Sequence, residues 1–582
     1  MKYPRIPYPT PTRQYKQYRF GGYDHRKSCS DGGIYDMLRL CGDDYPIVST
    51  MPKRAWKKIG APGFTENVTA WTRDFNGGNL YVIKEGDLYR DGTLIKSDFD
   101  EAGAGRCMVV FQNALILYGP NFKTKVYDIA EDTVSEIERY VTFGDAEHVS
   151  IEVTQDIEYT TVRVQKDGDR KFSDYFKVGD VLKYRLSRIG ELTDGSAIIR
   201  DISESSTFTV LKFDPEVIEA GEFDQGYFIH ECPRIERAVV HKNRIFGYAN
   251  GEMFASADGD CRNFYKFEGL ASDSWSGRTA DENDITGVFE YSGYPLFFTE
   301  TSLCRIYGDG GNEFTVSEMR MPGVMAGCSE SLATAQGILY YVSAEGVMRY
   351  TGNYPTLISE EWNERPTGVC VAGSDGERYR VTVSRGDEYV TFCYRDGMWH
   401  IEDRSLYKTY GYFYIAPYLY KLTECVLEHT EPIVLTEHQT AVIKYGPAED
   451  EDEYEEDSAG WKLAFPDAEA QNEWALTFGD FYGTAAGTVY VPEPNKVSMV
   501  KIVIRIELAG YADVSVNYDS EADWTLVKRL TSTAKRTHTL ALVPRRCDHF
   551  KIRIAGKGTA SVYELTREMI VGSTLKSKGG TQ

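Results

Sequence analysis

The sequence has little of what marks membrane-spanning and secreted proteins. It contains no uninterrupted apolar run of about 18 residues, so it predicts no helix that crosses a membrane. Its first residues, MKYPRIPYPTPTRQYKQYRF, have no apolar core and no small-residue cleavage site, and we therefore expect no secretory signal there.

Basic residues are also in short supply. The 582 residues include 65 Lys and Arg against 88 Asp and Glu, which gives a net charge of −23. Affinity for duplex DNA rests on neutralising phosphates with Lys and Arg. The composition therefore argues against specific duplex recognition, although an acidic wall could still guide DNA through a channel without holding it.

Clustered metal ligands are missing as well. The 11 cysteines are scattered, the nearest two being Cys29 and Cys41, and no Cys-x-x-Cys occurs. This pattern favours free thiols in a reducing compartment over a disulfide framework or a zinc ribbon. The nine histidines are dispersed too, so the sequence predicts no metal site.

Catalytic fingerprints are equally absent. No P-loop, Gly-x-Ser-x-Gly, His-Glu-x-x-His or complete Gly-x-Gly-x-x-Gly is found, so we predict no catalytic residue, no cofactor and no enzymatic activity. Segment 256–264 is similar to the Asp-box turn of sialidase propellers, but Asp260 stands where that motif has glycine. Any two of the 88 acids could form a glycosidase pair, and the sequence cannot select one.

Short β-strand patterns dominate what is present. Runs of β-branched and aromatic residues alternate with tight turns, as in NLYVIKEGDLYRDG (79–92) and GILYYVSAEGVMRYTG (337–352). The strand anchors of the repeated hairpins are spaced 35, 130, 51, 43, 42 and 38 residues apart; they are Leu80, Leu115, Ile245, Leu296, Leu339, Val381 and Leu419. Apart from one gap, these intervals bracket the length of a four-stranded propeller blade. A large β-sandwich with similar hairpins is the alternative.

The predicted fold is mainly β: a six- to seven-bladed β-propeller with an inserted small β-barrel and a C-terminal β-sandwich. The long gap between anchors holds the insertion, around FKVGDVLKYRL (176–186). In the C-terminal part, Val500, Ile502, Ile504, Ile506 and Leu508 alternate with other residues, as in a half-buried strand. The expected organisation is an extended arm (1–60), a propeller (61–144 and 234–446), an insertion (145–233), an acidic linker (447–460) and a sandwich (461–582).

The N-terminal arm and the acidic linker differ from the rest in composition. Pro4, Pro7, Pro9 and Pro11 prevent helix and remove ladder donors in the basic, Tyr-rich arm. We expect this arm to lie extended on the protein's own surface or on a neighbour. The run EDEDEYEED (449–457) is too self-repulsive to pack, and its spacing does not suit Ca²⁺.

Three segments together resemble proteins of bacteriophage tails. IYDMLRLCGDDYPIVSTMPKR (34–54), GEMFASADGDCRNFYKFEGLASDSW (251–275) and the C-terminal W…PRRCDHFKIRIAGKGTASVYELTREMIVGS (524–573) are similar to segments of tail hub, nozzle or "stabilisation" proteins. The resemblance implies a propeller-based virion protein that forms a homo-oligomeric ring, six-fold in the expected case. It would sit below the portal and adaptor, retain the genome and form part of the DNA ejection channel.

The resemblance also suggests partners and contact residues. The expected partners are other copies of the chain, the portal, the adaptor, other tail proteins such as fibres, and passing DNA, with synthesis in the host cytoplasm. The expected interface residues are Arg13, Tyr15, Tyr18, Phe20, Asp44, Tyr45, Lys53, Arg54, Arg545, Arg546, Asp548 and His549. Two alternatives stay open: a receptor-binding or fibre-anchoring tail protein, and a carbohydrate-active propeller, either a glycosidase or a lectin.

Overall fold

The structure is a computed structural model, and its described residues fall into two compact units. One unit comprises Met1–Glu66 with Glu330–Gln582, and the other is Asn67–Ser329. The described residues are 12–26, 33–51, 55–63, 68–74, 78–100, 103–120, 123–136, 141–143, 151–165, 172–174, 176, 178–179, 181–188, 191–223, 225–230, 232–265, 269–280, 283–429, 435–445, 461–463, 473–482 and 497–571.

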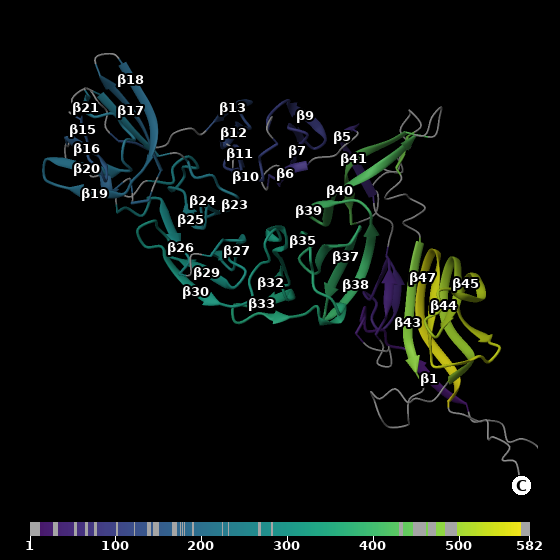
Figure 1. The fold of residues 1–582 in the computed structure, drawn as a ribbon. Helices are drawn as coiled ribbons and strands as arrows, with labels where there is room; N and C mark the ends of the chain where they lie inside the picture. The colour runs from purple at the N-terminus through teal and green to yellow at the C-terminus, as the bar shows by residue number, and fades with distance from the viewer. Residues whose placement is uncertain are drawn as a thin grey trace, which may run out of the picture. The chain divides into compact units, whose positions relative to one another are not determined.

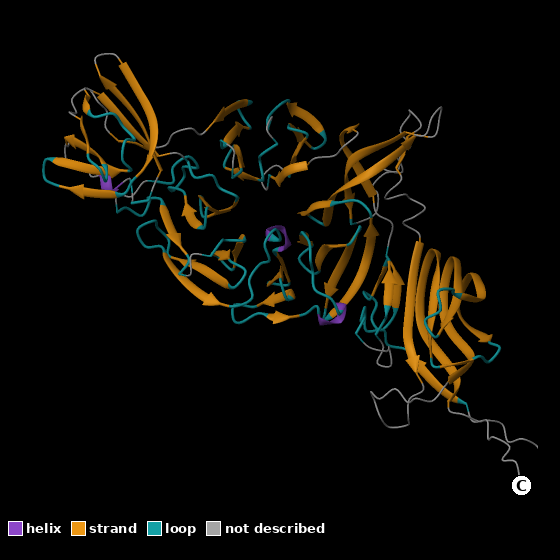
Figure 2. Ribbon diagram, in the orientation of Figure 1, coloured by secondary structure: helices purple, strands orange, loops and turns teal. Residues whose placement is uncertain are grey.

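Strands dominate both units, which confirms the predicted mainly β class (Figure 2). Within the described ranges the helical elements are three short 3₁₀ turns, η2 (Phe172–Asp174), η3 (Ser329–Ser331) and η4 (Glu360–Trp362). This part of the chain contains no helix with the length and apolar character that a membrane crossing requires.

The unit Asn67–Ser329 contains four antiparallel sheets in which each strand pairs with the next along the chain. Their strands are β6 (Val68–Arg73), β7 (Leu80–Lys84), β8 (Asp87–Arg90) and β9 (Thr93–Lys96); β10 (Cys107–Phe111), β11 (Ala114–Tyr118), β12 (Lys125–Asp128) and β13 (Thr133–Glu136); β23 (Arg237–His241), β24 (Arg244–Ala249), β25 (Glu252–Ala255) and β26 (Trp275–Arg278); β27 (Gly287–Tyr291), β28 (Tyr294–Phe298), β29 (Ser302–Tyr307) and β30 (Thr315–Arg320). This up-and-down order is that of a propeller blade.

Apolar packing between consecutive sheets stabilises this unit. The first strands are neighbours, since β10 contacts both β6 and β23, and β23 contacts β27. Central strands such as β7 and β24 are buried along their whole length. One cluster joins the sheets of β10 and β23 through Phe111, Ile116, Ile245 and Phe254.

Two further sheets lie between β13 and β23 in the sequence, in the region predicted as an insertion. Their strands are β14 (Val141–Phe143), β17 (Val181–Arg188), β18 (Glu191–Ile198) and β22 (Gln225–His230) in one sheet, and β15 (Ile151–Gln155), β16 (Thr160–Gln165), β19 (Asp201–Glu204), β20 (Phe208–Phe213) and β21 (Gly221–Phe223) in the other. Both sheets contribute to a single apolar core, in which Phe172 packs against Phe176 and Phe228.

The other unit contains three more sheets of the same up-and-down order. Their strands are β31 (Ala333–Ala335), β32 (Ile338–Ser343), β33 (Gly346–Tyr350) and β34 (Thr356–Leu357); β35 (Cys370–Ser374), β36 (Tyr379–Arg385), β37 (Glu388–Arg395) and β38 (Met398–Ser405); β39 (Thr409–Ile415), β40 (Tyr418–His429) and β41 (Leu435–Lys444), with β42 (Trp461–Leu463) beside β40. The fourth strand of the last sheet is β5 (Ala55–Gly63), which pairs with β41. The predicted boundary at residue 60 therefore falls inside a strand.

A separate nine-stranded sheet is formed by both ends of the chain (Figure 1). Its long strands are β43 (Glu473–Tyr482), β44 (Val497–Tyr518), β45 (Thr525–Ala541) and β47 (His549–Val571), with the short β46 (Arg546–Cys547). The N-terminal strands are β1 (Arg13–Gln17), β2 (Asp36–Leu38), β3 (Leu40–Cys41) and β4 (Val48–Thr50). Strands β1 and β4 pair with β47, and β2 pairs with β43.

The alternation predicted for β44 is found with one exception. Ile502, Ile504, Ile506 and Leu508 are buried, but Val500 is only half-buried. The pairing of β44 with β47 shifts register between Met499 and Lys501. A bulge of this kind adds one residue to the strand, so Met499 replaces Val500 on the buried face.

The Asp-box-like segment forms a turn at the end of β25. The Asp258 carboxylate accepts a hydrogen bond from the Asn243 amide at 3.0 Å, and Ala257 forms a bridge with Asp260. The buried Arg244 guanidinium donates to the carbonyls of Ser256 and Asp273 at 2.7 and 2.6 Å. The segment therefore orders backbone beside its sheet.

Candidate functional site

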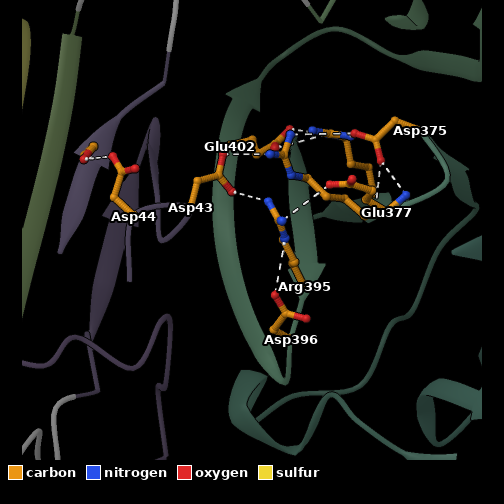
Figure 3. Close-up of polar contacts among 10 residues, drawn as sticks. Asp43, Asp44, Asp375, Glu377, Arg395, Asp396 and Glu402 are labelled. Atoms are coloured by element: carbon orange, nitrogen blue, oxygen red, sulfur yellow. Dashed lines mark hydrogen bonds and ion pairs between the residues drawn. The ribbon is translucent and has the colours of Figure 1, made fainter. Parts of the chain in front are cut away.

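A cluster of charged side chains lies where the N-terminal segment meets the sheet β35–β38. We call it the charged junction, and it consists of Asp43, Asp375, Glu377, Arg378, Arg380, Arg395, Asp396 and Glu402 (Figure 3). Strands β36, β37 and β38 supply Arg380, Arg395 and Glu402, the turns that flank β36 and β37 supply Asp375, Glu377, Arg378 and Asp396, and the turn after β3 supplies Asp43.

The centre of the junction is a buried ion pair. Arg380 Nε donates to the Glu402 carboxylate at 3.1 and 3.0 Å, and its Nη1 donates to Asp375 Oδ2 at 2.7 Å. The side chains of Arg380 and Glu402 are only 2% and 1% exposed. The guanidinium also lies 4.7 Å from the centre of the Tyr445 ring. The ion pair between Arg380 and Glu402 holds the surrounding residues in one arrangement, because separating buried opposite charges is costly.

Asp43 connects this centre to the N-terminal segment. Its Oδ2 accepts from Arg378 Nη2 at 2.8 Å, and its Oδ1 accepts from Arg395 Nη1 at 3.1 Å (Figure 3). Arg395 also pairs with Glu377 and Asp396, each at 3.4 Å. One carboxylate of the N-terminal segment thus joins Arg395 of β37 to Arg378 in the turn before β36.

A second set of buried charges lies farther along the same face of the sheet, where Thr391 is opposite Asp403 as Cys393 is opposite His400. Lys421 Nζ donates to Thr391 Oγ1 at 3.1 Å and lies 3.7 Å from Asp403. Asp403 also lies 3.5 Å from Arg39 Nη2, and Arg404 pairs with Asp36. The short stretch Arg39–Asp43 therefore contacts the sheet through charges at both of its ends.

Burial and charge shift the pKa values at the junction. Burial acts against the charge of Arg380, but the attraction of Glu402 outweighs it and raises the pKa well above its usual value. Burial would raise the pKa of Asp375, yet Arg380 lowers it overall. Both groups are therefore charged at neutral pH.

Part of the junction, including Asp43, Arg395 and Glu402, lines a cavity of about 390 Å³ together with Cys41 and His400. Burial raises the pKa of the Cys41 thiol to about 12 and lowers that of His400 to about 4. His400 is 4% exposed, and its Nε2 has no hydrogen-bond partner among the described residues. At neutral pH the thiol is protonated and the imidazole is neutral.

The charged side chains of the junction bind to one another and connect two segments of the chain. Its carboxylates are engaged by guanidinium groups, which fixes their positions. In the part of the chain that the structure describes, no three or more His, Cys, Asp and Glu side chains are arranged to hold a metal ion. The arrangement ties the N-terminal segment to the sheet.

Three of the predicted contact residues of the N-terminal arm, Arg13, Tyr15 and Phe20, have partners within the chain itself. Arg13 and Tyr15 are in β1 beside Met569 and Arg567 of β47, and the Arg567 guanidinium lies 5.0 Å from the Tyr15 ring. Phe20 is 1% exposed, with its ring 5.8 Å from that of Phe478, so it belongs to the chain's own core and departs from the expected neighbour contact.

Other predicted interface residues are more exposed. Tyr18 and Tyr45 are 53% and 52% exposed and are open to a partner. Asp44 accepts a hydrogen bond from Ser49 Oγ at 3.1 Å and does not take part in the charged junction, which uses the preceding residue. Lys53 and Arg54 lie outside the described residues.

The predicted C-terminal network forms inside the chain. Arg545 pairs with Glu521, and its guanidinium lies 5.0 Å from the Tyr518 ring. His549 Nε2 is 2.8 Å from Ser520 Oγ, and the backbone N–H of Asp548 donates to Asp519 at 2.6 Å. Arg546 is exposed in β46. These contacts fix the turn between β44 and β45.

Sequence reasoning missed Asp43, Arg380, Glu402 and His400. The stretch HIEDR (400–404) is rich in charge, which ordinarily indicates an exposed strand, and no local pattern shows that its residues are buried. Their partners lie up to 352 positions away in the chain, as for Asp43 and Arg395.

Comparisons with known proteins give only distant structural similarity. No protein-family model matches the chain, and no curated protein matches it. BamB from Moraxella catarrhalis is 10% identical with a TM-score of 0.33, covering 71% of this chain and 96% of that one. YCF48 from Cyanidioschyzon merolae is 8% identical with a TM-score of 0.27, covering 68% and 99%. The computationally designed Ika8 protein is 9% identical with a TM-score of 0.32, covering 66% and 99%. Because these similarities are so distant, the description of the fold is based on the strand pairing of this chain and not on the comparisons.

Proposed function

We propose that this chain is a structural protein of a bacteriophage tail, a ring-forming tail hub or nozzle below the portal and adaptor. Its sheets β6–β13, β23–β41 and β5 would form a seven-bladed propeller, in which β5 completes the blade of β39–β41. In this role the protein retains the genome and forms part of the channel through which DNA leaves.

The observation that carries the proposal is the charged junction. Arg380, Glu402 and Asp375 form its centre, and Asp43 ties the N-terminal segment to Arg378, which lies 3.7 Å from Asp375. That same segment provides strands β2, β3 and β4 of the nine-stranded sheet. A subunit that transmits load in a ring needs its β modules held together in this way.

Charge supports the same role. A net charge of −23 disfavours adhesion of the chain to passing DNA, because like charges repel. Three sequence segments resemble tail hub and nozzle proteins, which selects this role among those open to a propeller. Head-to-tail contacts whose rotation closes would produce the ring.

Quantitative mass spectrometry of gradient-purified virions tests the proposal. Six or twelve copies per portal dodecamer are expected for a hub or nozzle ring. Three copies would overturn it in favour of a receptor-binding or fibre-anchoring protein. Absence from the particle would overturn any virion role.

A saccharide-binding role is the second candidate, because of one depression on the nine-stranded sheet. It has a volume of about 380 Å³ and is lined by Tyr511, Asp513, Trp524 and Arg553, among others. Aromatic rings beside charged groups suit a sugar ring, which has apolar faces and polar edges. Binding to a glycan array that is lost in Trp524→Ala would favour this role, and no binding would discard it.

A further inference from the structure

Strand β45 carries an unusual concentration of positive charge for this acidic chain. Between Thr525 and Cys547 the sequence contains six Lys and Arg and no Asp or Glu. The six are Lys528, Arg529, Lys535, Arg536, Arg545 and Arg546. The rest of the chain must therefore hold a larger negative excess than the net charge of −23 indicates.

Four of these cations have no ion-pair partner among the described residues. Arg529 is engaged by Asp513 and Arg545 by Glu521, whereas Lys528, Lys535, Arg536 and Arg546 form no such pair. All four side chains are exposed. Lys535 lies over the Tyr563 ring at 3.7 Å, which positions its charge without neutralising it.

The backbone of β45 is open along one side as well. Within the described part of the chain β45 pairs with β44 alone, so it is an edge strand. Outward-facing N–H and C=O groups on an edge can accept another strand. The cations on β45 would repel a second β45 and attract an acidic strand.

We propose that β45 is a docking edge for the acidic segment 449–457 of a second copy of this chain. That segment has eight acidic residues in nine, and it falls between the described residues Tyr445 and Trp461. Extended, it is about 30 Å long, and Lys528 and Lys535 are about 23 Å apart along β45 at the usual rise per residue. The segment is therefore long enough to reach Lys528 near one end of the strand and Lys535 and Arg536 farther along it at the same time.

A peptide suits this edge better than DNA does. A peptide strand offers both donors and acceptors to the backbone of β45, whereas phosphates only accept. Contact between two unlike surfaces, one acidic and one basic, is also what a head-to-tail ring uses. The inference thus names a ring contact and rests on the proposed ring-forming function.

Zero-length cross-linking of the full chain tests the contact. Isotopically light and heavy chains are mixed, treated with a carbodiimide and digested. We expect Lys528 and Lys535 to be linked to segment 449–457 in mixed light–heavy peptides. The ion pair Lys242–Asp309, with its atoms 2.7 Å apart, is the internal control and must appear only in unmixed peptides.

The outcomes separate cleanly. Unmixed links alone would place the segment on its own chain and overturn the proposal. No link to 449–457 while the control forms would overturn it too. Binding of a fluorescent DNA duplex that is lost in Lys528→Glu with Arg536→Glu, without the cross-link, would reassign the edge to nucleic acid.

A charge-reversal pair then tests the energetic role. Lys528→Glu with Arg536→Glu is expected to raise the dissociation constant of the oligomer about tenfold or more in native mass spectrometry. Lys183→Glu with Arg188→Glu makes the same charge change on another sheet and should leave it unchanged. Rings that persist in the Lys528→Glu, Arg536→Glu variant would overturn the proposed contact but not the proposed function. The copy number in virions tests the proposed function separately.

Discussion

At the scale of single residues, the pair Arg380–Glu402 illustrates how a buried charge depends on its partner. Both side chains are almost fully buried, and each is hydrogen-bonded to the other. Removing Glu402 leaves the buried Arg380 with Asp375 as its only remaining partner in the charged junction, which is more damaging than removing Arg380 and Glu402 together.

We therefore expect Glu402→Gln to destabilise the protein by about 3–5 kcal/mol. The double variant Arg380→Met with Glu402→Leu should lose much less, because the buried cation is removed with its partner and Asp375 keeps Arg378 at 3.7 Å. Urea unfolding followed by intrinsic fluorescence measures both. Equal losses in the two variants would contradict this account.

His400 predicts a dependence of stability on pH. Burial lowers its pKa to about 4 from 6.5, so between these values the unfolded chain binds more protons than the folded one. The neutral His400 contributes about 3 kcal/mol to the free energy of unfolding. This contribution is fully present above about pH 6.5 and is lost as the pH falls toward 4.

Measuring the urea midpoint at pH 7, 5 and 4 tests this prediction. The wild-type chain should lose stability over that range, and His400→Asn should lose less because the titrating group is gone. A variant with the wild-type slope would assign the pH dependence to other groups.

At the scale of elements, the turn after β3 shows how one position in a sequence decides a contact. Burial acts against the charge of Arg395, but Asp43, Glu377 and Asp396 outweigh it and raise its pKa. Asp44, the next residue, accepts a hydrogen bond from Ser49 instead.

Asp43→Asn should therefore speed amide hydrogen exchange in residues 39–45, because the segment loses its tie to the sheet. The matched control is Asp44→Asn, which should leave exchange unchanged. The expected loss of stability is only about 1 kcal/mol, since these ion pairs are partly exposed. Exchange that changes equally in both variants would contradict the assigned role.

Strand β1 protects the C-terminal strand. It pairs with residues 565–569 of β47, and Lys16 lies 3.1 Å from Glu564. Deleting residues 1–19 uncovers that edge of β47, and exposed edges promote aggregation.

We expect this deletion to lower the melting temperature and to increase light scattering on heating. Deleting residues 1–11 keeps β1 and is the control. A deletion of residues 1–19 that melts and scatters like the control would show that β1 adds nothing to the sheet.

At the scale of the whole molecule, β5 joins residues far apart in the chain. It pairs with β41, with Lys57 opposite Val442 and Ala55 opposite Lys444. Residues 55–63 and 435–444, which lie nearly 400 positions apart in the sequence, therefore belong to one sheet. A propeller blade that takes one strand from a distant part of the chain has the same arrangement.

Lys57→Pro should weaken the β39–β41 sheet, because proline adds strain and lacks an N–H to donate. Hydrogen exchange in β41 should become faster, whereas Lys58→Ala, which keeps its N–H, should not change it. Unchanged exchange in the proline variant would show that β5 is not needed by that sheet.

The sequence determined the local structure of this protein. The hairpin between β7 and β8 was predicted from its strand runs around a tight turn, and in the structure the turn residues Glu85 and Gly86 adopt positive φ angles. The buried face of β44 followed from period-two alternation, except at Val500, where a bulge shifted the register. These features depend on neighbours a few residues away.

Tertiary structure alone decided the charged junction and the position of the N-terminal strands. Arg13 pairs with Met569, and Asp43 contacts Arg395, across hundreds of residues. The sequence indicated an extended arm and interface residues but could not say that Phe20 would be buried in the same chain. Composition and periodicity report on local geometry, whereas the partner of a charge or of an edge strand is set only when distant segments meet.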